Sequence, residues 1–231
     1  MNTNLPKHAE TADIPEFRRH LPALRRSLLR WFHIHQRDFP WRRTSNWFHL
    51  LMAEMMLRRT RADQVVPVYT EFCKRFTTPR EALHADPREF QKILQPLGLT
   101  WRSRQLRQTV HYLNDSFATR HPVPDDALEE IPGVGPYSNA VLRNRLFQER
   151  VAAVDSNVAR LICRLLGRPH HAESRRNREI IALANRFVNS PHSQDLNLAI
   201  LDLSALICKP RTPVCLQCPL QKLCMTGRAL E

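Results

Sequence analysis

Long apolar runs and export signals are missing from this sequence of 231 residues. No stretch approaches the ~20 apolar residues that a membrane span requires. The polar N-terminus, MNTNLPKHAETADIPEF, lacks the apolar core of a signal peptide. These absences predict a cytoplasmic protein without a membrane partner. Residues 1–13 are expected to be a disordered tail, and neither an internal repeat nor a low-complexity tract follows them.

Alternating apolar and polar runs, the mark of half-buried strands, are also scarce. Between residues 47 and 76 the apolar residues instead recur at intervals of three and four, as they do on one face of a helix. Pro79 and Pro87 are expected to begin short helices, and Gly98 is expected to end one. The expected fold class is therefore all-α.

Acidic residues are too few to balance the basic ones. The chain has 22 Asp and Glu against 35 Lys and Arg, a formal net charge of +13. Such an excess favours a polyanionic partner, because each neutralised phosphate releases condensed counterions. Ribosomal proteins and ordinary basic enzymes share this composition, so charge alone does not separate nucleic-acid binding from those classes.

Glycine is rare, with five residues in the chain, yet Gly133 and Gly135 flank Val134 in the segment LEEIPGVGPYSNAVL. This segment predicts a helical hairpin over residues 128–147, in which a tight glycine turn joins a short helix to a second one. The amides at the start of the second helix would form an anion site for a phosphate. The alternative is a simple turn between two packed helices.

Six cysteines are present, and four of them lie close together near the C-terminus. A reducing cytoplasm disfavours disulfides, so clustered thiols indicate a metal. The spacing C-x6-C-x2-C-x5-C suits either Zn²⁺ or a [4Fe-4S] cluster and does not by itself separate the two. Cys73 and Cys163 stand in apolar helical contexts, where buried core thiols are expected. The predicted metal ligands are Cys208, Cys215, Cys218 and Cys224.

The glycine hairpin, the cysteine loop and the segment AVDSNVARL at residues 153–161 occur together in one known family. With these features the chain resembles the endonuclease III and MutY branch of the helix-hairpin-helix DNA glycosylases over approximately residues 28–226. The resemblance implies that the four cysteines hold a [4Fe-4S] cluster, with Zn²⁺ as the alternative. It also implies that the Asp that follows the hairpin, Asp155, takes part in catalysis.

Two further segments bear on which branch of this family the chain resembles. FPWRR, from Phe39, and AEMMLRRT, from Ala53, are similar to stretches of MutY adenine glycosylases and of thymine-mismatch glycosylases. MutY proteins typically carry two glutamines at the positions of Arg58 and Arg59, so the arginine pair is more similar to the thymine-mismatch branch. MutY enzymes usually have a further domain that recognises oxidised guanine, and we expect none here because the sequence ends soon after Cys224.

The position of Tyr137 separates this chain from endonuclease III, which it resembles elsewhere. Endonuclease III carries a lysine nucleophile there and forms a Schiff base with it. Tyrosine has no amine, so an imine cannot form at Tyr137, and we expect a monofunctional glycosylase without lyase activity. Tyr137 is expected to face the DNA; the alternative is that it only packs against its neighbours.

The resemblance assigns chemistry to two carboxylates. Cleavage of an N-glycosidic bond builds positive charge on the sugar, and Asp155 is expected to stabilise that charge or to capture the sugar covalently. Its structural alternative, an N-cap of the next helix, is compatible with this role. Glu54 is expected at the base pocket, where it would protonate the leaving base or position water. Its alternative is an ion pair with Arg58 one helical turn away.

A flipped base leaves a gap in the duplex that a side chain must fill. Arg59 is one candidate for this wedge, with Arg58 reading the base pocket or the opposite guanine. The second candidate is the turn Gly98–Trp101, which precedes the basic residues Arg102 and Arg104. Its alternative is a helix C-cap followed by an exposed basic helix.

Three other residues are expected near the DNA. Asn157 would orient Asp155 or a phosphate, or would be a first-turn residue without a function. Lys209 and Arg211 in the cysteine loop would contact phosphates, with a solvated loop as the alternative. The complete predicted DNA-binding set is Arg58, Arg59, Gly133, Val134, Gly135, Asn157, Leu99, Trp101, Lys209 and Arg211.

We therefore expect two helical modules with a DNA cleft between them. A six-helix domain would span residues 46–145, whereas residues 14–45 and 146–231 would form a discontinuous iron-sulfur domain with its cluster loop at 208–224. The expected function is removal of thymine or uracil opposite guanine by a monomer. Its partner would be double-stranded DNA with a mismatched or modified base in a bacterial or archaeal nucleoid. The alternatives are adenine removal, excision of a modified pyrimidine, and a non-catalytic DNA-binding protein that retains the cluster.

Overall fold

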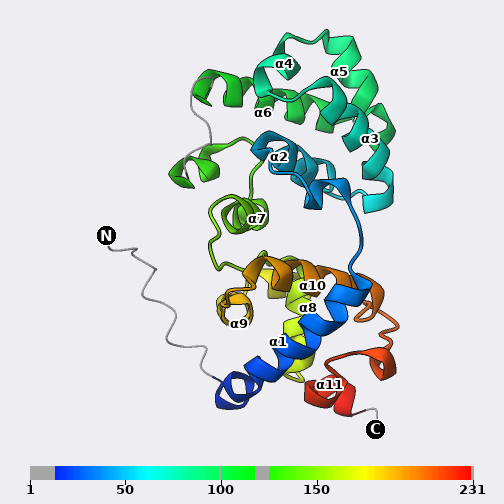
Figure 1. Cartoon of the computed structure of the whole chain (residues 1–231), viewed down its shortest axis with the longest axis vertical. Coiled ribbons are helices and arrows are strands. Elements are labelled where there is room, and N and C mark those ends of the chain that lie inside the picture. The colour runs from blue at the N-terminus through cyan, green and yellow to red at the C-terminus, as the bar shows by residue number, and fades with distance from the viewer. Residues whose placement is uncertain (1–13, 99, 118–124, 230–231) are drawn as a thin grey trace. The chain divides into compact units, whose positions relative to one another are not determined.

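The computed structural model describes residues 14–98, 100–117 and 125–229 (Figure 1). Within these ranges the chain is helical and contains no strand, which confirms the all-α fold class. None of the helices described there is long and apolar enough to cross a membrane. Leu99, a predicted DNA contact, and the predicted tail at 1–13 lie outside the described residues.

The chain divides into two compact units, each with its own hydrophobic core. The terminal unit comprises the chain up to Arg37 and from Gln148 onward, and the central unit is Asp38–Phe147. The sequence predicts the first border at residue 45. The border lies earlier because the rings of Phe39 and Trp41 stack at 4.8 Å and are buried in the core of the central unit.

The terminal unit is built around α1 (Pro15–His35), whose buried residues recur every three or four positions. α1 packs against α10 (Ser193–Leu206), which also contacts α8 (Ser156–Leu165). The side chain of Asn177 caps α9 (Arg178–Val188) by accepting hydrogen bonds from two of the first amides of that helix. The remaining elements are α9 (Arg178–Val188), α11 (Met225–Arg228) and the 3-10 helices η5 (Ala172–Arg176), η6 (Cys215–Gln217) and η7 (Gln221–Leu223).

The central unit contains six α-helices within the described residues. Pro79 and Pro87 stand in the first turns of α4 and α5, and Gly98, with φ +81°, ends η3, as the sequence predicts. The helices are α2 (Trp47–Met56), α3 (Ala62–Arg75), α4 (Pro79–His84), α5 (Pro87–Leu94), α6 (Thr100–Phe117) and α7 (Pro136–Leu146). The 3-10 helices are η2 (Pro40–Arg42), η3 (Gln95–Leu97) and η4 (Asp125–Glu130).

Candidate functional site

The predicted hairpin forms in the central unit between η4 and α7. Gly133 lies in its turn with φ +90°, a conformation that favours glycine. The Val134 amide closes the turn by donating to the Ile131 carbonyl at 2.9 Å. A Cβ atom at Gly133 would lie 2.8 Å from Cε of Met55, the flexible end of a side chain on α2, so that side chain would have to shift. The positive φ is what favours glycine at this position.

Two side chains from elsewhere in the central unit hold the carbonyls of this turn. Arg58, in the turn that follows α2, donates from Nη2 to the Gly133 carbonyl. Thr109, fully buried on α6, donates from Oγ1 to the Pro132 carbonyl at 2.7 Å. Gly135 is the N-cap of α7 and has no side chain to cap the first amides of that helix. The start of α7 thus has the backbone arrangement that binds anions at helix N-termini.

Three predicted residues lie on or just after α2. Glu54 is buried, with 8% of its surface exposed. Burial lowers the pKa of the half-buried Arg58, and the carboxylate of Glu54 opposes that lowering. The two side chains thus interact electrostatically, and Arg58 also contacts the hairpin. Arg59 is exposed and has the left-handed backbone angle φ +55°.

Asp155 is the N-cap of α8 in the terminal unit. Its Oδ1 accepts from the amides of Asn157 and Val158, both at 2.8 Å, and its Oδ2 accepts from Asn157 Nδ2 at 2.7 Å. The capping alternative predicted for Asp155 is thus observed. Asn157 thus makes the contact with this carboxylate that one of its predicted roles requires. Three donors fix a half-buried carboxylate in a single orientation.

A buried arginine continues this network toward the cysteine loop. Arg160, with 4% of its surface exposed, donates from Nη1 to Asn157 Oδ1 at 3.0 Å. Its Nε and Nη2 both donate to the Cys208 carbonyl, at 3.0 and 2.9 Å. One turn later, Arg164 Nη1 lies 3.2 Å from Cys208 Sγ and donates to the Lys209 carbonyl at 2.7 Å. Two arginines of α8 therefore hold the start of the loop.

All four predicted cysteine ligands line one pocket, together with Leu161, Ile207 and Leu220 among others. Cys208 and Cys224 are buried, and the other two are half-buried. Burial raises the pKa of Cys218 to about 12. No group of three or more His, Cys, Asp or Glu side chains within the described ranges is arranged to hold a metal ion. What the structure shows is that the four thiols line the same apolar pocket.

The remaining predicted residues are placed as follows. Tyr137 is half-buried in the first turn of α7, and Trp101 near the start of α6 is 46% exposed. Lys209 and Arg211 are exposed in the cysteine loop. Tyr137 and the residues of α2 belong to the central unit, whereas Asp155 and the cysteines belong to the terminal unit.

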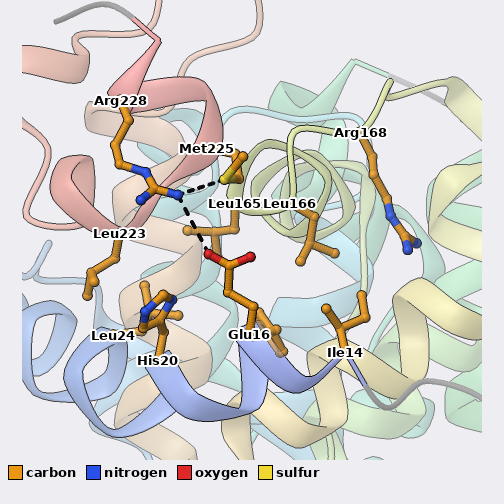
Figure 2. Close-up of a pocket in the computed structure, with 11 residues that line it drawn as sticks. Ile14, Glu16, His20, Leu24, Leu165, Leu166, Arg168, Leu223, Met225 and Arg228 are labelled. Atoms are coloured by element: carbon orange, nitrogen blue, oxygen red, sulfur yellow. Dashed lines mark hydrogen bonds and ion pairs between the residues drawn. The ribbon is translucent and has the colours of Figure 1, made fainter.

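A separate pocket of about 150 Å³ lies among α1, the end of α8 and α11 (Figure 2). Its apolar lining includes Leu165, and on its edge Arg228 Nη2 lies 3.8 Å from Glu16 Oε1. This pocket is at the opposite end of α8 from Asp155, about 15 Å away at the usual helical rise. None of the predicted site residues lines it.

Sequence reasoning missed Thr109, Arg160 and Arg164. The two arginines carried a usable signal, because with Asn157 they recur at intervals of three and four on one face of a helix that is otherwise rich in buried apolar residues. A charged residue in such a stripe requires buried partners. Thr109 carried no such signal, since its partner is the main chain of Pro132.

A helical protein with a glycine hairpin at the start of one helix and a carboxylate that caps another has the features of the helix-hairpin-helix class of DNA-processing enzymes. The comparison with known families agrees: residues 52–198 match the HhH-GPD superfamily of base excision DNA repair proteins. The chain belongs to this superfamily.

Several characterised proteins are similar along most of their length. The thymine/uracil-DNA glycosylase of Methanothermobacter thermautotrophicus is 32% identical over 86% of this chain and 90% of its own. The thymine-DNA glycosylase of Aeropyrum pernix is 31% identical over 89% of this chain and 94% of its own. The structure of a thermostable thymine-DNA glycosylase superposes with a TM-score of 0.84 at 30% identity, over 91% of this chain and 98% of its own.

Two other similarities are more distant. The human adenine DNA glycosylase is 28% identical over 90% of this chain, which spans 40% of that protein. A trapped endonuclease III–DNA covalent intermediate has the same fold, with a TM-score of 0.75 at 20% identity over 92% of this chain and 98% of its own. The helical fold is thus shared with endonuclease III.

Proposed function

We propose that the protein is a DNA N-glycosylase that removes thymine or uracil opposite guanine and has no lyase activity. The observation that carries the chemistry is the carboxylate of Asp155, which three donors hold in one orientation. The substrate is supported by the two archaeal relatives that are named for thymine or uracil removal and align over nearly their whole length.

Asp155 would act on the sugar. As the bond between C1′ and the base nitrogen breaks, its electron pair leaves with the base and positive charge develops on the deoxyribose. A fixed carboxylate stabilises that charge without having to reorganise in the transition state. Water then adds to C1′ and gives up a proton, and the departed base gains one. The products are a free base and an abasic site.

We propose catalytic roles for Glu54 and Tyr137 as well. Glu54 is buried on α2, interacts electrostatically with Arg58, and would bind the extruded base or position water. Thymine and uracil leave as stabilised anions, so protonation by Glu54 matters less than it would for adenine. Tyr137 offers a hydroxyl and no amine, so no Schiff base forms and the DNA strand stays intact.

The four cysteines would hold a [4Fe-4S] cluster. The proposal is supported by the four cysteines lining one apolar pocket, since four cysteine thiolates are the donor set of such a cluster. Zn²⁺ is the alternative, since it accepts the same donors. When bound, the group would keep the loop at residues 208–224 folded against α8.

Double-stranded DNA would be gripped by backbone and basic side chains. The hairpin amides would bind one phosphate, and Lys209 and Arg211 would contact others. Arg59 or Trp101 would fill the gap left by the flipped base. We expect a monomer that acts in the cytoplasm, where the nucleoid is found.

Adenine removal is the second candidate, supported by the match to the human adenine DNA glycosylase. A duplex panel with G:T, G:U, adenine opposite 8-oxoguanine, and modified pyrimidines separates the candidates when abasic sites are cleaved with alkali. We expect release from G:T and G:U. Cutting of the adenine substrate alone would overturn the proposed substrate. The Asp155→Asn variant is the matched control, expected to bind DNA and release no base.

A further inference from the structure

We propose that Arg58 is a positioning residue of the glycine hairpin and does not read bases, and that Thr109 shares this task. The two side chains hold consecutive carbonyls of the turn, those of Gly133 and Pro132. The proposal rests on the proposed DNA glycosylase function, because the purpose of the turn is to bind a DNA phosphate.

The contact with Thr109 determines which way a hairpin amide faces. In a trans peptide unit the carbonyl and the N–H point in opposite directions. Thr109 holds the Pro132 carbonyl toward α6 at 2.7 Å, so the Gly133 amide of the same peptide unit points away from α6. The next amide, that of Val134, is used to close the turn. Thr109 thus directs the Gly133 amide toward an external acceptor.

The guanidinium of Arg58 faces the turn with both of its terminal nitrogens. Nη2 donates to the Gly133 carbonyl, and Nη1 lies 3.7 Å from the position of a Cβ atom on Gly133. A Cβ atom on Gly135 would lie 4.0 Å from Nη2. Reading a guanine requires the guanidinium fork to present two donors to the base edge. At Arg58 this fork is packed on the two glycines.

The placement of Arg58 also contributes charge. A half-buried cation next to the turn favours an anion at the outward amides, as in other backbone anion sites. The carboxylate of Glu54 opposes the lowering of the Arg58 pKa by burial. Arg59, the next residue, is exposed. The adjacent arginines would therefore have different tasks: one supports the turn and the other meets DNA.

Three variants test this division: Arg58→Met, Thr109→Val and, for comparison, Arg59→Ala. Thr109→Val changes no charge and removes the hydrogen bond to Pro132 while keeping the shape of the side chain. The measurements are hydrogen exchange of the hairpin amides in the free protein, affinity for undamaged and G:T duplexes as a function of salt, and relative base release across the duplex panel. Thermal unfolding of each variant checks that the fold is retained.

We expect Arg58→Met and Thr109→Val each to speed exchange of the hairpin amides and to weaken binding to both duplexes about tenfold, the cost of one well-made hydrogen bond. Base preference should not change. The salt slope should fall by about one for Arg59→Ala and by much less for Arg58→Met, because only a cation on a phosphate releases a counterion.

Two outcomes would overturn the proposal. One is unchanged hairpin exchange in Arg58→Met together with altered base preference, which would make Arg58 a base reader. The other is a full unit of salt slope lost in Arg58→Met, which would place it on a phosphate. Failure of the proposed function is distinguishable, because the wild type would then release no base from any duplex while the exchange measurement still reports on the turn.

Discussion

The guanidinium of Arg160 donates two hydrogen bonds to the main-chain carbonyl of Cys208, from Nε at 3.0 Å and from Nη2 at 2.9 Å. Its remaining nitrogen donates to Asn157 Oδ1, and the Asn157 amide group donates in turn to Asp155 Oδ2. The first cysteine of the loop is thereby joined to the proposed catalytic carboxylate through two side chains of α8, those of Arg160 and Asn157. We therefore expect order in the loop and the orientation of Asp155 to be coupled.

Replacing Arg160 tests this coupling. Arg160→Met keeps an apolar stem and removes every donor, leaving buried acceptors at Cys208, Ser204 and Asn157. We expect the free energy of unfolding to fall by about 3 kcal/mol. Iron content and base release should fall with it, and binding of undamaged duplex should fall less. Arg160→Lys retains the charge without the planar fork and should be intermediate. Wild-type iron content and turnover in Arg160→Met would contradict the coupling.

The helix-capping role of Asp155 and its proposed catalytic role can be separated by substitution. Asparagine caps helices nearly as well as aspartate, whereas alanine does not. Asp155→Asn should therefore unfold at nearly the wild-type denaturant concentration, and Asp155→Ala should lose about 1 kcal/mol. Both should abolish base release, because neither carries a carboxylate. Equilibrium denaturation and the duplex panel measure the two effects. Turnover in Asp155→Asn would show that the residue is only a cap.

The helical fold followed from sequence signals that are local. Pro79 and Pro87 begin helices because proline fits the first turn and lacks only an amide that has no partner there. The border between the units was misplaced, however. Phe39 and Trp41 join the central core through stacking with each other and an edge contact to Tyr69, and no local pattern encodes a partner so far along the chain.

The candidate site likewise contains residues that local motifs indicate and residues whose partners lie far away in the sequence. The sequence indicates Asp155 and the four cysteines as candidates because their neighbours in sequence form recognisable motifs. The principal contact of Arg58 is a main-chain carbonyl 75 residues away, so its sequence neighbours suggested only Glu54 as a partner. The same holds for Arg160, whose loop acceptor lies 48 residues away. Side chains that bind main-chain carbonyls are identified from structure, because any residue can supply a carbonyl.

Cysteine replacements distinguish ligands from core thiols. Cys218→Ser should lose the brown colour and the iron of the purified protein, because serine is a poor ligand for iron-sulfur clusters. Cys163 is buried at 2% exposure in the same unit but does not line the cysteine pocket. Cys163→Ala should keep both iron and colour, with a small loss of stability from the cavity. Stoichiometric zinc in wild-type protein made with iron supplied would contradict cluster ligation.

Cys73 in the central unit should be unreactive at neutral pH. Burial raises the pKa of its thiol from an ordinary value of 9.0 to about 11, and its neighbour Tyr69 has a raised pKa as well. At pH 8 alkylation of native protein should spare Cys73, as peptide mass mapping would show.

The raised pKa of Cys73 also makes stability depend on pH. Above about pH 9 the Cys73 thiol of the unfolded state loses its proton while that of the folded state keeps it, so the free energy of unfolding should decline toward pH 11. In Cys73→Val that decline should be shallower; equal slopes would rule out this assignment.

Backbone strain at Arg59 provides a test of the wedge. Its φ of +55° is costly for a residue with a side chain, and Gln148 has the same feature at +58°. Glycine at either position should stabilise the fold by about 1 kcal/mol. Arg59→Gly should in addition slow base release from duplex DNA, since nothing then fills the gap. Gln148→Gly is the matched control, with the same gain in stability and wild-type turnover. Equal turnover of both variants on duplex would assign the wedge to another residue, with Trp101 the exposed candidate.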